Sequence, residues 1–134
     1  PVAFVVERRG VRAAVLTDLG HASPAVTRLF ETLDVALLET NHDRAKLREG
    51  PYPSSLKRRV GGDHGHLSNA QAARLVRDHA SRRFRGILLG HLSDSNNDPL
   101  LAEEAIRGAL ARRRDLDVDV RLTYRDRAAP ALQV

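Results

Sequence analysis

The stretch VALLETNHD, residues 35–43, sets four apolar residues directly before a run of polar side chains that can act as ligands. A second stretch, GILLGHLSD at residues 86–94, repeats this arrangement and places His91 shortly after its apolar run. Short continuous apolar runs are typical of buried strands in a parallel sheet. In such sheets the chemistry collects just beyond the carboxyl ends of the strands. Both stretches therefore predict strands that end at a functional site.

The remainder of the chain alternates strands and helices in the same way. Residues 3–16 predict a strand hairpin that turns at Arg9-Gly10, and residues 118–124 alternate like a half-exposed strand. Helix-start signals stand at Ser23-Pro24, Ser68 and Asn97-Asp98-Pro99. These signals predict helices over residues 24–33, 69–83 and 99–113, with two short helices flanking the Gly50-Pro51-Tyr52-Pro53 break. The order predicts an α/β fold, with helices packed on a sheet.

Composition limits the kind of protein that this can be. A length of 134 residues suits one domain, and no apolar run is long enough to cross a membrane, so we expect no membrane partner. The absence of cysteine excludes disulfides and thiolate metal sites and favours the cytoplasm. A metal must then be held by imidazole and carboxylate groups. The first residue is Pro1 and methionine is absent, which predicts a processed chain or a piece of a longer protein.

The charge balance is basic, with a formal net charge of +5. Of the 22 basic residues only Lys46 and Lys57 are lysines, and the planar arginine side chain suits phosphate. Nucleic acid is one explanation of this balance, and a compositional habit of the source genome is the other.

Two residues that follow predicted strands form the first candidate site. Asp18 lies two residues after Leu16, and His91 lies two residues after Leu89. Each has an ordinary structural alternative, as a turn residue or as a hydrogen-bonded histidine. If they meet across one sheet edge, they are candidate metal ligands, although catalytic zinc generally takes three protein ligands.

The stretch GGDHGHLSN, residues 61–69, forms the second candidate site. It runs straight into a predicted helix start, where free backbone N–H groups favour an anion. We therefore interpret His66, Ser68 and Asn69 as a loop for substrate phosphate or proton transfer, with His64 as an exposed loop residue. A capped helix start without any ligand is the structural alternative.

Residues in the middle of the chain complete the candidates. His42 and Glu39 can face a cleft, unless Asp43 only caps a helix there. Tyr52 can pack, or stack on a base or sugar. The run Lys57, Arg58 and Arg59 is either a solvated face or a set of phosphate contacts.

Three segments taken together resemble a known family: LTDLG at 16–20, the long string at 37–69 and LLGHLSDSNNDP at 88–99. They are similar to the metallo-β-lactamase-fold hydrolases, and most of all to the YycJ/WalJ-type branch of bacterial DNA exonucleases. The resemblance runs to about residue 105. It implies a four-layer αββα sandwich with a site for two divalent metal ions, zinc or manganese, between its sheets. It also implies that Asp18 bridges the two ions and that His91 binds the second.

The metal motif H-x-H-x-D-H of that family is missing from this sequence. We therefore expect residues 1–127 to be the C-terminal half of such a domain, one mixed sheet with flanking helices, and residues 128–134 to be a frayed tail. Most metal ligands then lie in the other half, and we expect this chain alone to be inactive and to hold little metal. Half a sandwich exposes an apolar sheet face, with Val5, Val15, Leu37 and Leu88 as candidates, which favours self-association into a homo-oligomer.

The functional expectation is a metal-dependent phosphodiester hydrolase in the complete protein, a DNA exonuclease. Asp18 and His66 are its expected catalytic residues, Asp18 and His91 its metal ligands. The expected substrate-binding residues are His66, Ser68, Asn69, Lys57, Arg59, Tyr52 and His42. A hydrolase of a small ester, thioester or cyclic diester is the alternative with the same fold. A metal-free module without catalysis is the alternative of a different class.

Overall fold

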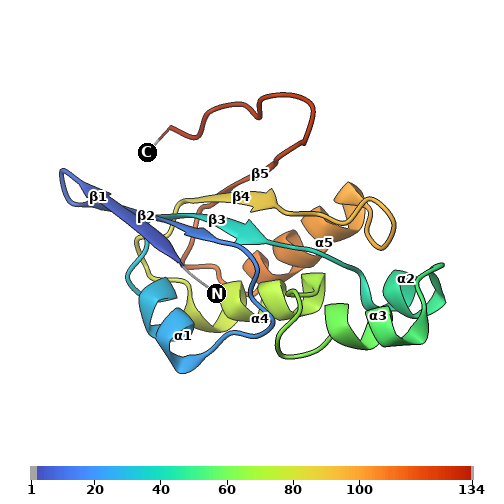
Figure 1. The fold of residues 1–134 in the computed structure, drawn as a ribbon. Helices are drawn as coiled ribbons and strands as arrows, with labels where there is room; N and C mark the ends of the chain where they lie inside the picture. Colours follow the sequence, from blue (N-terminus) through green and yellow to red (C-terminus); the bar gives the residue numbers. More distant parts are fainter. Residues whose placement is uncertain (1–2, 134) are drawn as a thin grey trace.

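The structure is a computed structural model that describes residues 3–133. One five-stranded sheet carries helices on one of its faces (Figure 1). The elements in chain order are β1 (Phe4–Arg8), β2 (Val11–Leu16), α1 (Pro24–Phe30), β3 (Val35–Glu39), α2 (Arg44–Glu49), α3 (Ser54–Val60), α4 (Asn69–His79), β4 (Gly86–Gly90), α5 (Pro99–Leu110) and β5 (Asp119–Leu122). The α/β class and the mixed sheet predicted from the sequence are confirmed.

The strand order is the sequence order, β1-β2-β3-β4-β5. β1 and β2 are antiparallel, whereas every pair from β2 to β5 is parallel. Parallel neighbours need crossover connections, which are almost always right-handed. Because all three crossovers step in the same direction across the sheet, their helices α1, α4 and α5 lie on the same face (Figure 1). Residues 3–133 therefore form two layers, and within this range the opposite sheet face carries no helix.

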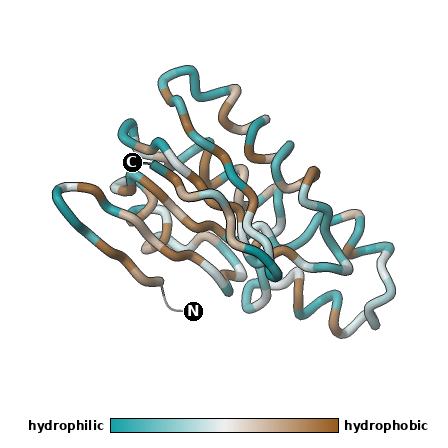
Figure 2. Tube along the Cα trace, turned by 90° about the horizontal axis from the view of Figure 1, so that it is seen from above, coloured by the Kyte–Doolittle hydropathy of each residue, from teal (hydrophilic) through white to brown (hydrophobic). Residues whose placement is uncertain are grey.

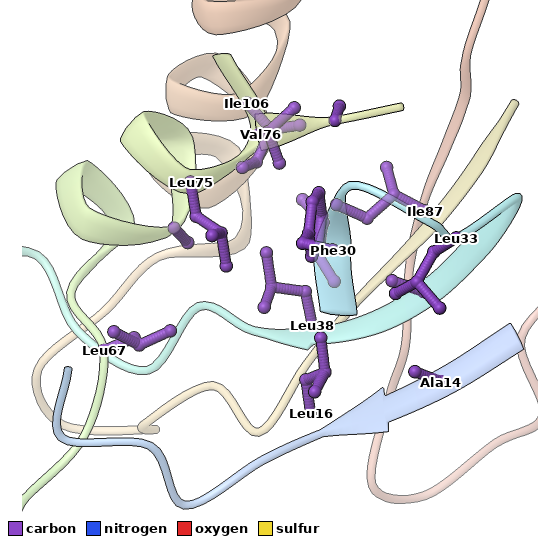
Figure 3. Close-up of a cluster of buried hydrophobic side chains, with 14 of the residues drawn as sticks. Ala14, Leu16, Phe30, Leu33, Leu38, Leu67, Leu75, Val76, Ile87 and Ile106 are labelled. Atoms are coloured by element: carbon purple, nitrogen blue, oxygen red, sulfur yellow. The ribbon is translucent and has the colours of Figure 1, made fainter. Parts of the chain in front are cut away.

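The core lies between the sheet and these helices. Alternate strand residues point into it, so that Leu16, Leu38 and Leu89 are buried on the inner face. The helices contribute Phe30, Leu75 and other apolar side chains to the same cluster (Figure 3). The helices α1, α4 and α5 begin at their predicted start signals but end three or four residues earlier than predicted, and α2 and α3 are the two short helices expected around residues 50–53. α4, for example, ends where Ala80 adopts an extended conformation.

The outer sheet face is also apolar. Val15, Leu37 and Leu88 are partners in the sheet register and lie on this face, where Phe4 continues the row on β1. Figure 2 shows apolar stretches running along the strands. Val5 was expected on this face, but that expectation is wrong. It pairs with Ala14, whose buried side chain points towards the helices, and it is exposed because β1 extends beyond the helix layer.

The chain after β5 doubles back over the outer face. Arg121 donates a hydrogen bond to the Ala131 carbonyl, and the Leu132 side chain lies close to Gly86. Residues 128–133 form no helix or strand, and residue 134, the last of the expected tail, lies outside the described residues. Within residues 3–133, no helix combines the length and the apolar character that crossing a membrane requires.

Candidate functional site

Three loops meet beyond the carboxyl ends of the parallel strands. Asp18 follows β2, His91 follows β4, and His66 precedes α4, which is connected to β3 through α2 and α3. Because β2, β3 and β4 run parallel, their ends share one edge of the sheet. Residues far apart in the sequence are thereby brought to one place.

Asp18, His66 and His91 form a group of possible metal ligands. One ligand atom from each lies within 4.8 Å of the others. Asp18 Oδ1 is 3.8 Å from His66 Nδ1 and 4.0 Å from His91 Nε2. The centroids of the two imidazole rings are 5.1 Å apart. One carboxylate and two imidazoles are donors that suit zinc or manganese, and three is the number of protein ligands at many catalytic zinc sites.

Glu39 supports both histidines from beneath. Its side chain is completely buried, and its Oε1 lies 2.7 Å from Nδ1 of both His66 and His91. Its Oε2 accepts from the backbone N–H of Leu19 at 2.9 Å. An ionised carboxylate only accepts hydrogen bonds, so each Nδ1 donates and each Nε2 is left free to act as a ligand. This carboxylate–histidine arrangement is the usual support of metal-binding histidines, and the donor set therefore fits a metal.

Sequence reasoning mentioned Glu39 but did not place it at the site. Its position could have indicated this role, because Glu39 follows Leu38 directly at the end of a buried parallel strand. A carboxylate buried at that point needs hydrogen-bond donors, and the neighbouring strand ends were the obvious source.

The backbone at the site is unusual. Asp18 and His91 have φ angles of 58° and 55°, a region that residues other than glycine seldom adopt. Such conformations persist only where their surroundings hold them, and they gather at functional sites. Asn41 is one such support, because its buried side chain donates to the His91 carbonyl at 2.8 Å. Its own N–H donates to the Leu67 carbonyl, which links the two histidine loops.

Glycines allow the loops to close on one another. A Cβ atom at Gly20 would overlap the Asp63 carbonyl, and one at Gly65 would overlap the carbonyl oxygens of Arg59 and Val60. Only glycine fits such close backbone approaches. The glycine-rich stretch 61–69 is therefore a packing feature that brings His66 to the site.

The anion-binding interpretation of that stretch is not supported. Ser68 forms a capping box with Gln71, in which the Ser68 N–H donates to the Gln71 side chain and Ser68 Oγ accepts from the Gln71 N–H. The N–H of Asn69 donates to the His42 carbonyl. These N–H groups at the start of α4 are thus already used, and the structural alternative, a capped helix, is correct.

Three expected substrate-binding side chains do not reach the surface. Ser68, Asn69 and His42 are 0%, 4% and 2% exposed. Asn69 is occupied by Asn97, with which it exchanges two side-chain hydrogen bonds. Burial lowers the pKa of His42 to about 4 and leaves its ring neutral at physiological pH. These side chains hold the loops together from inside, so they are not carried into the proposed substrate site.

The other expected substrate-binding residues lie on or beside α3. Tyr52 is half-buried and lines a cavity of about 340 Å³ that also includes His66 and His91. Lys57, on α3, donates to the Arg48 carbonyl, while Arg58 and Arg59 are exposed. Together α2 and α3 carry six basic residues next to the end of β3 (Figure 1): Arg44, Lys46, Arg48, Lys57, Arg58 and Arg59.

Comparison with known proteins agrees with the resemblance seen in the sequence. The chain is 38% identical over 124 residues to exodeoxyribonuclease WalJ from Streptococcus pneumoniae, a match that covers 90% of this chain and 46% of that protein. It is 33% identical over 110 residues to exodeoxyribonuclease YycJ from Bacillus anthracis, with 82% of this chain and 42% of that protein covered. No family model matches the chain. The chain thus spans under half the length of the curated relatives that it matches.

Proposed function

We propose that the complete protein hydrolyses phosphodiester bonds in DNA from a strand end, and that this chain supplies one side of its metal-dependent active site. The observation that carries the proposal is the convergence of Asp18, His66 and His91 on one sheet edge. It occurs in a chain that is similar over nine-tenths of its length to a protein named as an exodeoxyribonuclease. The basic helices α2 and α3 next to this edge suit a polyanionic substrate.

Asp18 and His91 are the proposed metal ligands. When bound, divalent ions supply a hydroxide at neutral pH and neutralise charge on the phosphate. Asp18 presents an exposed carboxylate, and His91 presents a free Nε2 because Glu39 occupies its Nδ1. The remaining ligands are proposed to come from the part of the protein outside this chain. There a second sheet would cover the outer apolar face and complete the αββα sandwich.

His66 is proposed as the proton donor to the leaving oxygen. It shares Glu39 with His91 but is less exposed, and the contact of 2.7 Å between its Nδ1 and Glu39 Oε1 fixes the direction in which its Nε2 points. When the ring carries both protons, Nε2–H can donate one of them to the oxygen leaving phosphorus. Arg59 and the neighbouring basic side chains of α3 are proposed to hold the backbone phosphates beyond the reacting bond.

Variants of the complete protein separate these roles. We expect His66→Gln to retain its metal and to lose turnover of duplex DNA by about a hundredfold or more, the range for loss of a general acid. His91→Ala should lose both metal and turnover. Normal turnover by His66→Gln would remove the proton-donor role. Hydrolysis of a small diester without any hydrolysis of DNA would instead favour the small-substrate alternative.

A further inference from the structure

A cavity opens directly beside the proposed metal ligands. His66 and His91 form one of its walls, and Tyr52, Leu92 and Arg125 contribute to the others. We refer to this space, lined by these five residues and their neighbours, as the Tyr52 cavity. A phosphodiester held at Asp18, His66 and His91 has this cavity as an adjoining space for its nucleoside.

We infer that the Tyr52 cavity receives the terminal nucleoside of a DNA strand, unpaired from its partner. This inference rests on the proposed function. The volume of about 340 Å³ is at the small end of the range for ligand pockets, about 300–1,000 Å³. A volume at this end of the range suits one nucleoside rather than two paired ones.

Tyr52 gives the cavity an aromatic surface in a fixed position. It lies between Pro51 and Pro53, whose rings restrict the backbone on either side, and it is half-buried. Every base has a flat face that can stack on an aromatic ring, so stacking binds bases without selecting among them. An enzyme that removes successive nucleotides must bind all four bases at this position. Leu92 adds an apolar contact that is equally unselective.

Arg125 stands on the rim of the same cavity. Its guanidinium lies 3.2 Å from Asp94, and both side chains are largely exposed, at 83% and 77%. Exposed ion pairs of this kind are weak, so a phosphate can displace the aspartate and take the guanidinium. Ser93 and Ser95, which also line the cavity, offer hydroxyl groups to the sugar. Base, sugar and the next phosphate thus each have a chemically suitable partner.

One consequence concerns paired ends. A terminal base must leave its partner to enter the cavity, and unpairing costs least where the end is already mismatched. The complete protein should therefore degrade a duplex with a mismatched terminal pair faster than a fully paired one. The cavity would be equally accessible to single strands.

The test compares Tyr52 variants of the complete protein on DNA with a mismatched end and on the same DNA with an abasic terminal nucleotide, which has no base to stack. We expect Tyr52→Leu to raise KM for mismatched-end DNA about tenfold, which corresponds to the loss of one stacked base. KM for the abasic-ended DNA should not change. Tyr52→Phe keeps the aromatic face and should restore KM for DNA.

The outcomes separate the inference from the proposed function. Equal KM for wild type and Tyr52→Leu, with no preference for mismatched ends, overturns the inference while DNA hydrolysis itself persists. Absence of hydrolysis of any DNA by the wild type overturns the proposed function and the inference with it. A parallel loss on both substrates by Tyr52→Leu shows a structural role and also overturns the inference.

Discussion

Glu39 is the residue on which both site histidines depend. One oxygen accepts from His66 and His91, and the other accepts from the backbone of the loop that carries Asp18. A single buried carboxylate thereby touches all three elements of the candidate metal group. Buried ionised groups are tolerated only when they are fully hydrogen-bonded, and here the hydrogen bonds also orient the ligands.

Glu39→Gln tests this dependence. The amide cannot accept at both of its ends, so the hydrogen bonds to the histidines and to Leu19 cannot all survive. We expect metal affinity of the complete protein to fall by about 10- to 100-fold, the usual effect of losing a carboxylate that supports a metal-bound histidine. Metal titration measures it. Glu31→Gln is the control, because Glu31 bonds His79 at 2.8 Å on the surface and should have no effect.

His42 makes the stability of this chain depend on pH. Its ring is buried, its Nδ1 has no partner within the described residues, and burial lowers its pKa to about 4. Between pH 6.5 and 4 the unfolded chain binds a proton at His42 that the folded chain does not. Stability is therefore fully present above pH 6.5 and is lost as the pH falls towards 4.

The expected loss from His42 is about 3 kcal/mol across that window. Urea unfolding at pH 7.5 and pH 4.5 measures it for the wild type and for His42→Phe, which keeps a ring but has no titrating group. The variant should lose clearly less stability between the two pH values. If His42→Phe loses as much stability between pH 7.5 and pH 4.5 as the wild type does, the pH dependence arises from other groups.

At the scale of elements, packing between the glycine loop and α3 positions His66. Gly65 is buried, and the carbonyl oxygens of Arg59 and Val60 occupy the space that a side chain would need. The His66 N–H donates to the Val60 carbonyl at 2.9 Å, which ties the backbone of the site histidine to the end of α3.

Gly65→Ala should therefore displace this loop from α3. We expect it to destabilise the chain by about 1–3 kcal/mol, the usual effect of overpacking a filled site. The matched control is Gly108→Ala, because a Cβ at Gly108 in α5 meets no atom within 4 Å. That substitution should stabilise the helix by about 0.5–1 kcal/mol. Thermal unfolding of both variants shows whether the fold requires a residue without a side chain at position 65.

The elements were predictable from the sequence where periodicity and capping agreed. The runs at 35–38 and 87–89 gave buried strands, and Ser23, Ser68 and Asp98 marked the starts of three helices. Helix ends were less predictable because they depend on tertiary contacts. The site was only partly predictable, since strand ends brought Asp18 and His91 together, whereas the hydrogen bonds of Glu39 depend on loop conformations. Burial of His42, Ser68 and Asn69 followed from the same loop packing.

At the scale of the whole molecule, the outer sheet face is an apolar surface without a helix layer. Phe4, Val6 and Val15 are 66%, 66% and 41% exposed, while the Leu132 side chain of the segment after β5 lies close to Gly86 on the same face. Contiguous apolar surface of this kind normally meets a partner. In the complete protein we propose the second sheet of a sandwich as that partner, and in the isolated chain a second copy.

The isolated chain should therefore associate with itself. Sedimentation at micromolar concentrations should show dimers or larger species, and Val15→Lys should shift them towards the monomer, because a buried unpaired charge opposes the contact. Leu100→Lys is the control, since Leu100 is 66% exposed on α5, away from the sheet face. A wild-type chain that stays monomeric over this range would show that the face needs no partner.

The most direct test of the proposed metal site is the metal content of the complete protein, measured as ions per chain for wild type, His91→Ala and His79→Ala. His79 lies on α4, where its ring bonds Glu31 at the surface, so its loss should leave the site intact. We predict that His91→Ala loses metal relative to wild type, while His79→Ala retains it all. Equal metal content in all three proteins would contradict a metal site that includes His91.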